Sequence, residues 1–159
     1  MQDKQPDSSP EKKRKIVPPV YLLSCLILMW PLQRYLPIYD YIEPPLAYAG
    51  IIVILCGIII TAISAGVFLK VDTGLEPFDE AKVLVTSGFY RYTRNPMYIG
   101  MFLMLFGAAF MFGSLSALFP IPVFFLIMRN NFVLGEERFC EAAFGQQYLD
   151  YKSKVRRWI

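Results

Sequence analysis

Residues 44–69 read PPLAYAGIIVILCGIIITAISAGVFL and contain no charged residue. A helix of about 20 apolar residues crosses the hydrocarbon core of a bilayer, so this segment is long enough to form one membrane span. A second charge-free segment, residues 97–128, is too long for one span and is interrupted near its middle by FGSLS. We therefore predict a helical hairpin that turns at Gly113 and Ser114. A further, weaker span is predicted at about residues 16–37, where a helix tolerates Pro31 because it lies in a membrane.

Composition supports the same class of protein. The chain has 159 residues, of which 55% are hydrophobic and 16% aromatic. A soluble domain of this length rarely carries so much apolar side chain, so the excess is expected to face lipid. We predict an all-α integral membrane protein with about four transmembrane helices and a cytoplasmic amphipathic C-terminal helix. Its predicted parts are a basic tail (1–15), two N-terminal spans (16–69) and a core (70–159).

The positions of the basic residues predict how the chain is oriented. Of sixteen Lys and Arg residues, only Arg34 lies between the first two predicted spans. With four spans, the other fifteen share one side of the membrane, which the positive-inside rule assigns to the cytoplasm. Both termini and the loop 70–96 are therefore predicted to be cytoplasmic. The N-terminal tail lacks the apolar core of a signal peptide.

Several kinds of chemistry are disfavoured by the residues present. The chain contains no histidine, which excludes Ser-His-Asp hydrolysis and histidine-ligated metal or haem. Cys25, Cys56 and Cys140 are far apart and form no CxxC pair, so we expect free thiols. We expect neither a metal nor a nucleic-acid partner.

The second predicted span carries small residues at steps of four. Gly57, Thr61 and Ala65 would share one face of a helix. Small residues let membrane helices approach closely, so this pattern predicts a packing surface.

The segment GFYRYTRNPMYIG, residues 88–100, places two arginines and three tyrosines directly before the predicted hairpin. Asn95 and Pro96 are the favoured residues for the cap and first position of a helix. Two interpretations stay open. The segment is a helix start at the membrane surface, with Arg91 and Arg94 reaching the headgroups, or it is a site for a charged ligand.

A second polar segment follows the hairpin, EERFCEAAFGQQYLDYKSKVRRWI at residues 136–159. Adjacent carboxylates at Glu136 and Glu137 repel each other unless positive or hydrogen-bonding groups lie near them. Two interpretations stay open: the two glutamates have such groups beside them, or they are simple charges at a helix start. Leu149, Val155 and Trp158 continue an amphipathic pattern suited to the membrane surface.

The predicted hairpin brings these two segments together. Because its turn lies on the outer side, Arg94–Tyr98 and Arg129–Glu137 are expected to be neighbours on the cytoplasmic side. One segment offers guanidiniums and a helix N-terminus, and the other offers carboxylates. This combination favours a zwitterionic ligand with a carboxylate, hydroxyls and a cationic centre.

The motifs at residues 70–159 resemble those of the isoprenylcysteine carboxyl methyltransferase family and the related phospholipid methyltransferases. That family shows Gly-x-Tyr, Arg-His-Pro-x-Tyr-x-Gly, a Glu-Glu pair and Phe-Gly-x-x-Tyr-x-x-Tyr in this order. The corresponding residues here are Gly88 and Tyr90, Arg94 to Gly100, Glu136 and Glu137, and Phe144 to Tyr151.

The resemblance implies a helical membrane enzyme that binds S-adenosylmethionine in a cytoplasmic pocket and takes a lipid-like acceptor from the bilayer, in the prokaryotic-type branch and hence in a bacterial inner membrane. The implied cofactor-binding residues are Lys82, Val83, Leu84, Val85, Tyr90, Asn95, Pro96, Met97, Tyr98 and Glu136. The implied catalytic residues are Arg94, Arg129 and Glu137. The family's histidine is Asn95 here, and an arginine that eukaryotic members place near the acceptor is Phe132, for which Arg129 is the candidate substitute.

The expected reaction is carboxyl O-methylation, since a carboxylate acceptor needs charge neutralisation but no general base. Phospholipid N-methylation is the alternative, and it would require a base such as Glu137. A non-enzymatic membrane subunit with the same fold is the second alternative.

Overall fold

The computed structural model describes residues 17–39, 42, 45–70 and 83–159. The described chain is helical apart from its connections, and Thr93 and Arg156 form an isolated parallel β-bridge. The helices are α1 (Pro18–Tyr35), α2 (Ala49–Lys70), α3 (Pro96–Phe112), α4 (Pro120–Met128), α5 (Leu134–Phe144) and α6 (Gln146–Lys154). Shorter 3₁₀ turns are η1 (Leu46–Tyr48), η2 (Gly88–Arg91) and η3 (Leu115–Leu118), and η4 (Arg129–Val133) is a π-helical turn.

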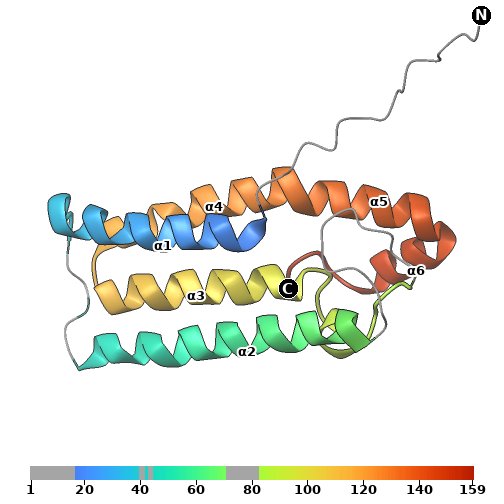
Figure 1. Cartoon of the computed structure of the whole chain (residues 1–159), viewed down its shortest axis with the longest axis horizontal. Helices are drawn as coiled ribbons and strands as arrows, with labels where there is room; N and C mark the ends of the chain where they lie inside the picture. The colour runs from blue at the N-terminus through green and yellow to red at the C-terminus, as the bar shows by residue number, and fades with distance from the viewer. Residues whose placement is uncertain (1–16, 40–41, 43–44, 71–82) are drawn as a thin grey trace, which may run out of the picture.

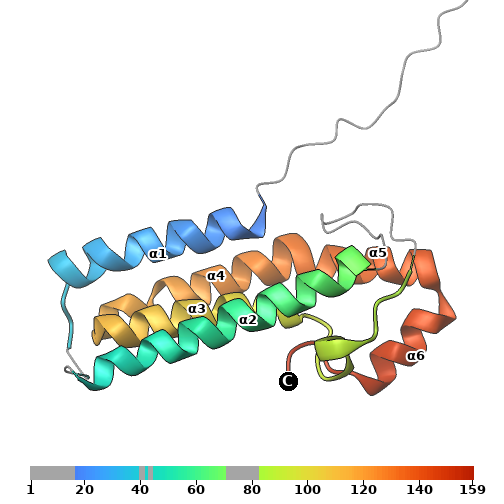
Figure 2. The ribbon, with the colours of Figure 1, turned by 60° about the horizontal axis from the view of Figure 1, so that its bottom comes forward.

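Four helices, α1 to α4, lie side by side along the long axis of the molecule (Figures 1 and 2). α2 packs along α3, and α1 packs against α3, α4 and η3. Neighbours in sequence run in opposite directions, so α1 and α3 begin at the end of the bundle where α5 and α6 lie, and α2 and α4 end there (Figure 1). The topology therefore brings residues 88–96 and 129–159 to one end, as the sequence predicts.

Paired glycines allow the backbones of α2 and α3 to touch. A Cβ on Gly57 would lie 2.5 Å from the carbonyl oxygen of Gly100, and one on Gly107 would lie 2.6 Å from that of Gly50. The two glycines on each helix are seven residues apart, so both fall on the same face in antiparallel register. Thr61 belongs to this seam because its hydroxyl donates to the Met97 carbonyl at 3.4 Å. The predicted packing role of Gly57 and Thr61 is confirmed.

The turn between α3 and η3 lies where the sequence predicts it. Gly113 has φ +66°, a left-handed conformation that glycine adopts without strain, and it ends α3 by donating to the Ala109 carbonyl at 3.1 Å. A Cβ here would also collide with the carbonyl of Ile42. Buried Ser114 and Ser116 share a hydroxyl hydrogen bond of 2.9 Å inside the turn. The turn itself is thus formed by small and polar residues.

The helix from α4 to α5 continues through the π-helical turn η4. A π turn inserts one residue into the helical repeat and rotates all later side chains. Buried Phe132 and Val133 face the core, where Phe132 packs edge-on against Tyr21 with ring centroids 5.9 Å apart. Because α5 has no free N-terminus of its own, Glu136 and Glu137 are not charges at a helix start.

The outer surface of the bundle is strongly apolar. By length and composition, two helices of the described chain could each cross a membrane, Leu46–Phe68 and Leu115–Phe144, and Pro96–Phe112 is a shorter apolar helix. Large side chains such as Ile52 and Ile59 on α2 and Ile27 on α1 are exposed. Such contiguous apolar surface is typical of helices that face lipid. The weaker span predicted at residues 16–37 is the helix α1, and the count of four spans stays a prediction.

The chain beyond α5 differs from the predicted amphipathic helix. Gly145 ends α5, α6 runs back along it, and Lys152 pairs with Glu141 to join the two helices. Val155 is extended, with φ −118° and ψ 128°, so it ends the helix instead of continuing it. Trp158 packs edge-on against Phe102, with centroids 5.8 Å apart. The expectation that Val155 and Trp158 share the face of a surface helix is wrong, because the tail turns inward to the bundle.

Candidate active site

The segment before α3 is shaped by a tight turn and by pairing with the end of the chain. Gly88 has φ +62° and opens η2, which leads to Thr93 and Arg94. The Arg94 amide donates to the Arg156 carbonyl at 3.0 Å, forming the bridge between Thr93 and Arg156. The backbone of residues 93–95 is therefore positioned by residues more than sixty positions away in sequence.

Asn95 stands at the cap position of α3, with Pro96 as the first helical residue, as predicted. Its side chain makes no capping hydrogen bond. Instead, Asn95 Nδ2 donates to the Arg157 carbonyl at 2.9 Å, and Thr93 Oγ1 donates to the same oxygen at 3.1 Å. The buried Asn95 thus connects the start of α3 to the end of the chain.

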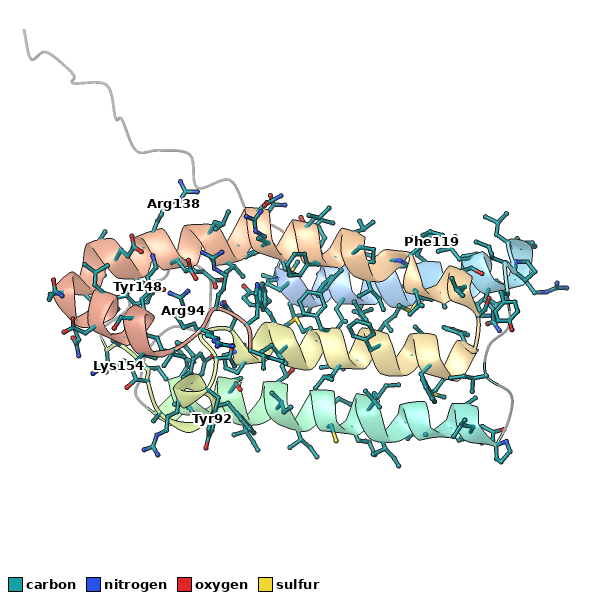
Figure 3. All side chains as sticks on the ribbon, turned by 180° about the vertical axis from the view of Figure 1, so that it is seen from behind. Tyr92, Arg94, Phe119, Arg138, Tyr148 and Lys154 are labelled. Carbon is teal, nitrogen blue, oxygen red and sulfur yellow. The ribbon has the colours of Figure 1, made fainter. Side chains whose placement is uncertain are left out.

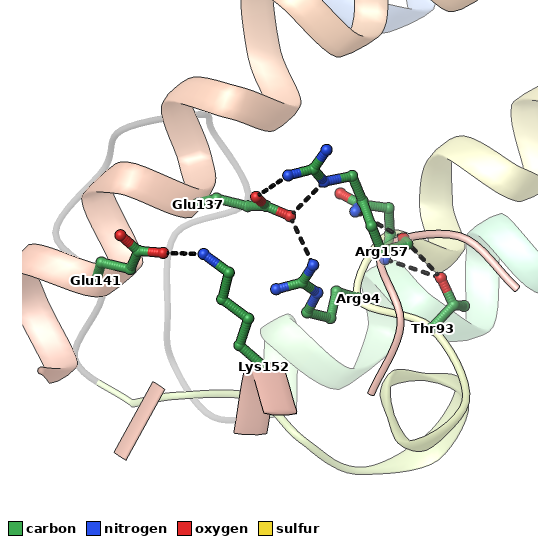
Figure 4. Close-up of polar contacts among 7 residues, drawn as sticks. Thr93, Arg94, Glu137, Glu141, Lys152 and Arg157 are labelled. Carbon is green, nitrogen blue, oxygen red and sulfur yellow. Dashed lines mark hydrogen bonds and ion pairs between the residues drawn. The ribbon is translucent and has the colours of Figure 1, made fainter. Parts of the chain in front are cut away.

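Glu137 accepts ionic contacts from two arginines (Figure 4). Arg157 binds it with both arms of its guanidinium, Nε to Oε1 at 2.9 Å and Nη2 to Oε2 at 2.7 Å. Arg94 Nη2 lies 3.2 Å from Oε1. The hydrogen bonds that Arg157 donates to Glu137 raise the pKa of Arg157, so its guanidinium stays charged. The predicted proximity of Arg94 and Glu137 is confirmed.

Arg94 is buried to an unusual degree for an arginine. Its side chain is 8% exposed, and its Nε and Nη1 have no hydrogen-bond partner among the described residues. Figure 3 shows it enclosed at the end of the bundle covered by α5 and α6, whereas Arg138 points away from the bundle. Buried donors without acceptors cost about 1–3 kcal/mol each, more when charged. Two such donors on one guanidinium favour an anionic group at this place.

Two tyrosines, Tyr90 and Tyr98, lie near the second carboxylate, Glu136. Tyr98 donates its hydroxyl to Glu136 Oε1 at 2.6 Å. Tyr90 packs edge-on against Phe68 with centroids 5.5 Å apart, and Tyr151 donates its hydroxyl to the Tyr90 carbonyl at 2.7 Å. Burial, with a smaller contribution from Glu136, raises the pKa of Tyr90. Burial likewise raises the pKa of Tyr151 to about 12, so both phenols are protonated at neutral pH.

The other predicted site residues are placed less uniformly. Val85 and Pro96 are buried, Leu84 and Met97 are partly buried, and Val83 is exposed. Lys82 lies outside the described residues.

Arg129 is not brought to the two glutamates. It lies in the π turn, where its Nη1 donates to Asn130 Oδ1 at 3.1 Å, and it forms no ion pair among the described residues. Its predicted substitution for the family arginine stays a prediction.

Two contributors to the site were missed by sequence reasoning, Thr93 and Arg157. Thr93 directly precedes Arg94, and Arg157 directly precedes Trp158. In the sequence, Arg157 stands out only as one of the fifteen basic residues that predict the orientation. The useful signal would have been the aromatic Trp158 directly after it, since an apolar ring next to two arginines favours a tail that turns inward.

Comparison with known proteins identifies relatives. The sequence model of the phospholipid methyltransferase family matches residues 46–147, a range that includes α2 as well as the motifs after residue 70. An uncharacterized protein of Haemophilus influenzae is 33% identical over 63 residues, which are 40% of this chain and the whole of that protein. The protein-S-isoprenylcysteine O-methyltransferase of Schizosaccharomyces pombe is 32% identical over 73 residues, 46% of this chain but only 31% of the yeast enzyme. With the family match covering more than half of its length, the chain belongs to the phospholipid methyltransferase family.

Proposed function

We propose that the chain is an S-adenosylmethionine-dependent methyltransferase that acts on a lipid-like acceptor in the membrane, with carboxyl O-methylation as the favoured reaction. The observation that carries the proposal is the buried side chain of Arg94. It pairs with Glu137, and its Nε and Nη1 have no hydrogen-bond partner in the part of the chain that the structure describes. Because the chain belongs to a methyltransferase family, we interpret this anion-binding feature as part of a site for the methyl donor or the acceptor.

The residues at the site fit the cofactor. S-adenosylmethionine carries a carboxylate, an ammonium group and ribose hydroxyls on one molecule. The free donors of Arg94 suit a carboxylate, and Glu136 suits a hydroxyl or an ammonium group. We assign the cofactor to these two residues, the aromatic rings of Tyr90 and Tyr98, and the start of α3 at Asn95–Met97, with Val83–Val85 beside them.

The chemistry demands little of the protein beyond placement. When bound, the sulfonium supplies a methyl group that is already activated for transfer. The contribution of the chain is to orient donor and acceptor, which is worth several orders of magnitude in rate when the geometry is fixed. A frame tied together by Thr93, Asn95 and Arg157 suits this task, because it holds the arginines and carboxylates without reorganisation.

The favoured acceptor is a carboxylate because Glu137 is poorly suited to act as a base. Both of its oxygens already accept guanidinium hydrogen bonds. Taking a proton from an amine would require breaking these contacts, whereas a carboxylate needs only a cation to offset its charge. Phospholipid N-methylation is the second candidate, favoured by the description of the family that matches.

We further propose that α1 to α4 all cross a bacterial inner membrane, with both termini and the site on the cytoplasmic side. The support is the arrangement of the bundle, in which residues 88–96 and 129–159 meet at one end, together with the fifteen basic residues assigned to that side. The acceptor then reaches the site from the bilayer.

The test is methyl transfer in membranes that contain the chain. Membranes are incubated with methyl-labelled S-adenosylmethionine and either an S-prenylated N-acetylcysteine or phosphatidylethanolamine. A methyl ester releases label as methanol in alkali, whereas an N-methyl group is stable, so the product distinguishes the two reactions. Label in neither acceptor, together with no binding of S-adenosylhomocysteine in a calorimetric titration, would favour the non-enzymatic subunit.

A further inference from the structure

Glu137 is contacted by two arginines with different geometries. Arg157 takes the forked geometry, with two donors on two oxygens at 2.9 and 2.7 Å. Arg94 makes a single contact of 3.2 Å with one of these oxygens. A carboxylate and a guanidinium bind most strongly through two parallel hydrogen bonds. The forked position on Glu137 is therefore occupied by the arginine that is more exposed, 31% against 8% for Arg94.

This arrangement leaves the deeper arginine partly free. Within the triad of Arg94, Arg157 and Glu137, two positive charges face one negative charge. Nε and Nη1, which have no partner within residues 17–39, 42, 45–70 and 83–159, belong to Arg94, the buried member. If Arg157 were absent, Glu137 could form a forked pair with Arg94, which would occupy Nε or Nη1 in addition to the Nη2 that already contacts it.

Arg157 is held in place independently of Glu137. Its carbonyl accepts hydrogen bonds from Thr93 Oγ1 and Asn95 Nδ2. The next residue, Trp158, packs on Phe102 and on Phe125, the latter with centroids 5.4 Å apart. These contacts use the backbone or a neighbouring ring, so a change of the Arg157 side chain leaves them intact.

We propose that Arg157 is a positioning residue that keeps Glu137 from closing on Arg94 and so reserves the free Arg94 donors for a ligand carboxylate. The inference rests on the proposed function, in which that carboxylate belongs either to the amino-acid part of the methyl donor or to the acceptor. It adds a role for a residue that touches neither molecule.

The central experiment is calorimetric binding of S-adenosylhomocysteine to the purified chain in detergent. Arg157→Ala should weaken binding at least about tenfold, the loss expected for one charge-assisted hydrogen bond. Glu137→Gln in the same variant should restore most of the affinity, because a neutral amide cannot form an ion pair with Arg94. A residue that only supports the fold would give no such restoration. Arg138→Ala, which removes an exposed guanidinium bound to the Leu134 carbonyl of its own helix, is the control and should bind like the wild type.

A second ligand distinguishes whether the cofactor or the acceptor supplies the carboxylate that binds Arg94. Methylthioadenosine lacks the amino-acid part, so its binding should be unaffected by Arg157→Ala if the cofactor supplies the carboxylate. If the acceptor supplies it, binding of S-adenosylhomocysteine is unchanged while the KM for a carboxylate acceptor rises about tenfold, and Glu137→Gln reverses the rise. Arg157→Lys keeps charge and stem without the fork and should give an intermediate loss, which covers the case in which Arg157→Ala does not fold.

Wild-type affinity and wild-type KM in both Arg157 variants would overturn the positioning role, as would a loss that Glu137→Gln fails to reverse. A wild-type chain that neither binds S-adenosylhomocysteine nor transfers methyl groups would instead overturn the proposed function itself.

Discussion

Replacing Arg94 by lysine tests whether its buried guanidinium binds a ligand. Lysine keeps the positive charge and can keep the contact with Glu137, which is 3.2 Å long in the native protein. It cannot reproduce the two further donors, Nε and Nη1, in the plane of a guanidinium. Losing one charge-assisted hydrogen bond to a ligand costs about 1.5–3 kcal/mol. We therefore expect kcat/KM for methyl transfer to fall roughly 10- to 150-fold.

The assay compares label transfer and membrane insertion in the same preparations. Arg138→Lys is the matched control, because it makes the same exchange on the exposed side of α5 and should leave transfer unchanged. Normal insertion with reduced transfer supports the ligand role. Full activity of Arg94→Lys would refute it, since a cation at the headgroups or a partner of Glu137 needs only the charge. The anion site would then have to be sought near Arg129.

Three other predictions concern packing, the second carboxylate and topology. Gly100→Ala should destabilise the protein by about 1–3 kcal/mol, because the added methyl group would overlap the Thr61 hydroxyl. Gly66→Ala, with nothing within 4 Å, should not destabilise it, and thermal unfolding in micelles measures both. Glu136→Gln should weaken S-adenosylmethionine binding roughly 10- to 150-fold in a calorimetric titration, and unchanged affinity would leave it only its contact with Tyr98. Reporters fused at the two ends should both be cytoplasmic, with residues 36–45 external, and opposite locations would remove the four-span arrangement.

Local signals predicted the parts of the fold that depend on local chemistry. Charge-free runs marked α2, α3 and α4, and Gly113 with Ser114 marked the hairpin turn because a left-handed residue and a polar pair are needed there. The meeting of Arg94 and Glu137 followed from the hairpin alone, since both flank it on the same side. The small residues Gly57 and Thr61 indicated a close contact, although only the structure identifies Gly100 as the facing residue.

What could not be predicted depends on contacts between distant segments. The amphipathic pattern of Leu149, Val155 and Trp158 favoured a helix. Backbone pairing with Thr93 and an aromatic pocket for Trp158 stabilise an extended tail instead. The π turn at Arg129–Val133 has no sequence signal that we recognise, and it sets which later side chains face the site.

The glycine seam between α2 and α3 has a consequence for how this chain can change over evolutionary time. Between most tightly packed helices, the steric overlap caused by a larger residue can be relieved by a smaller residue on the facing helix. Here Gly50 faces Gly107 and Gly57 faces Gly100, so the facing residue is already the smallest that exists. An enlarging mutation at any of the four would meet a backbone carbonyl oxygen, which no substitution on the facing helix can remove. We expect descendants of this chain to keep or lose the four together, while the apolar residues on the outer faces of the same helices exchange freely for one another.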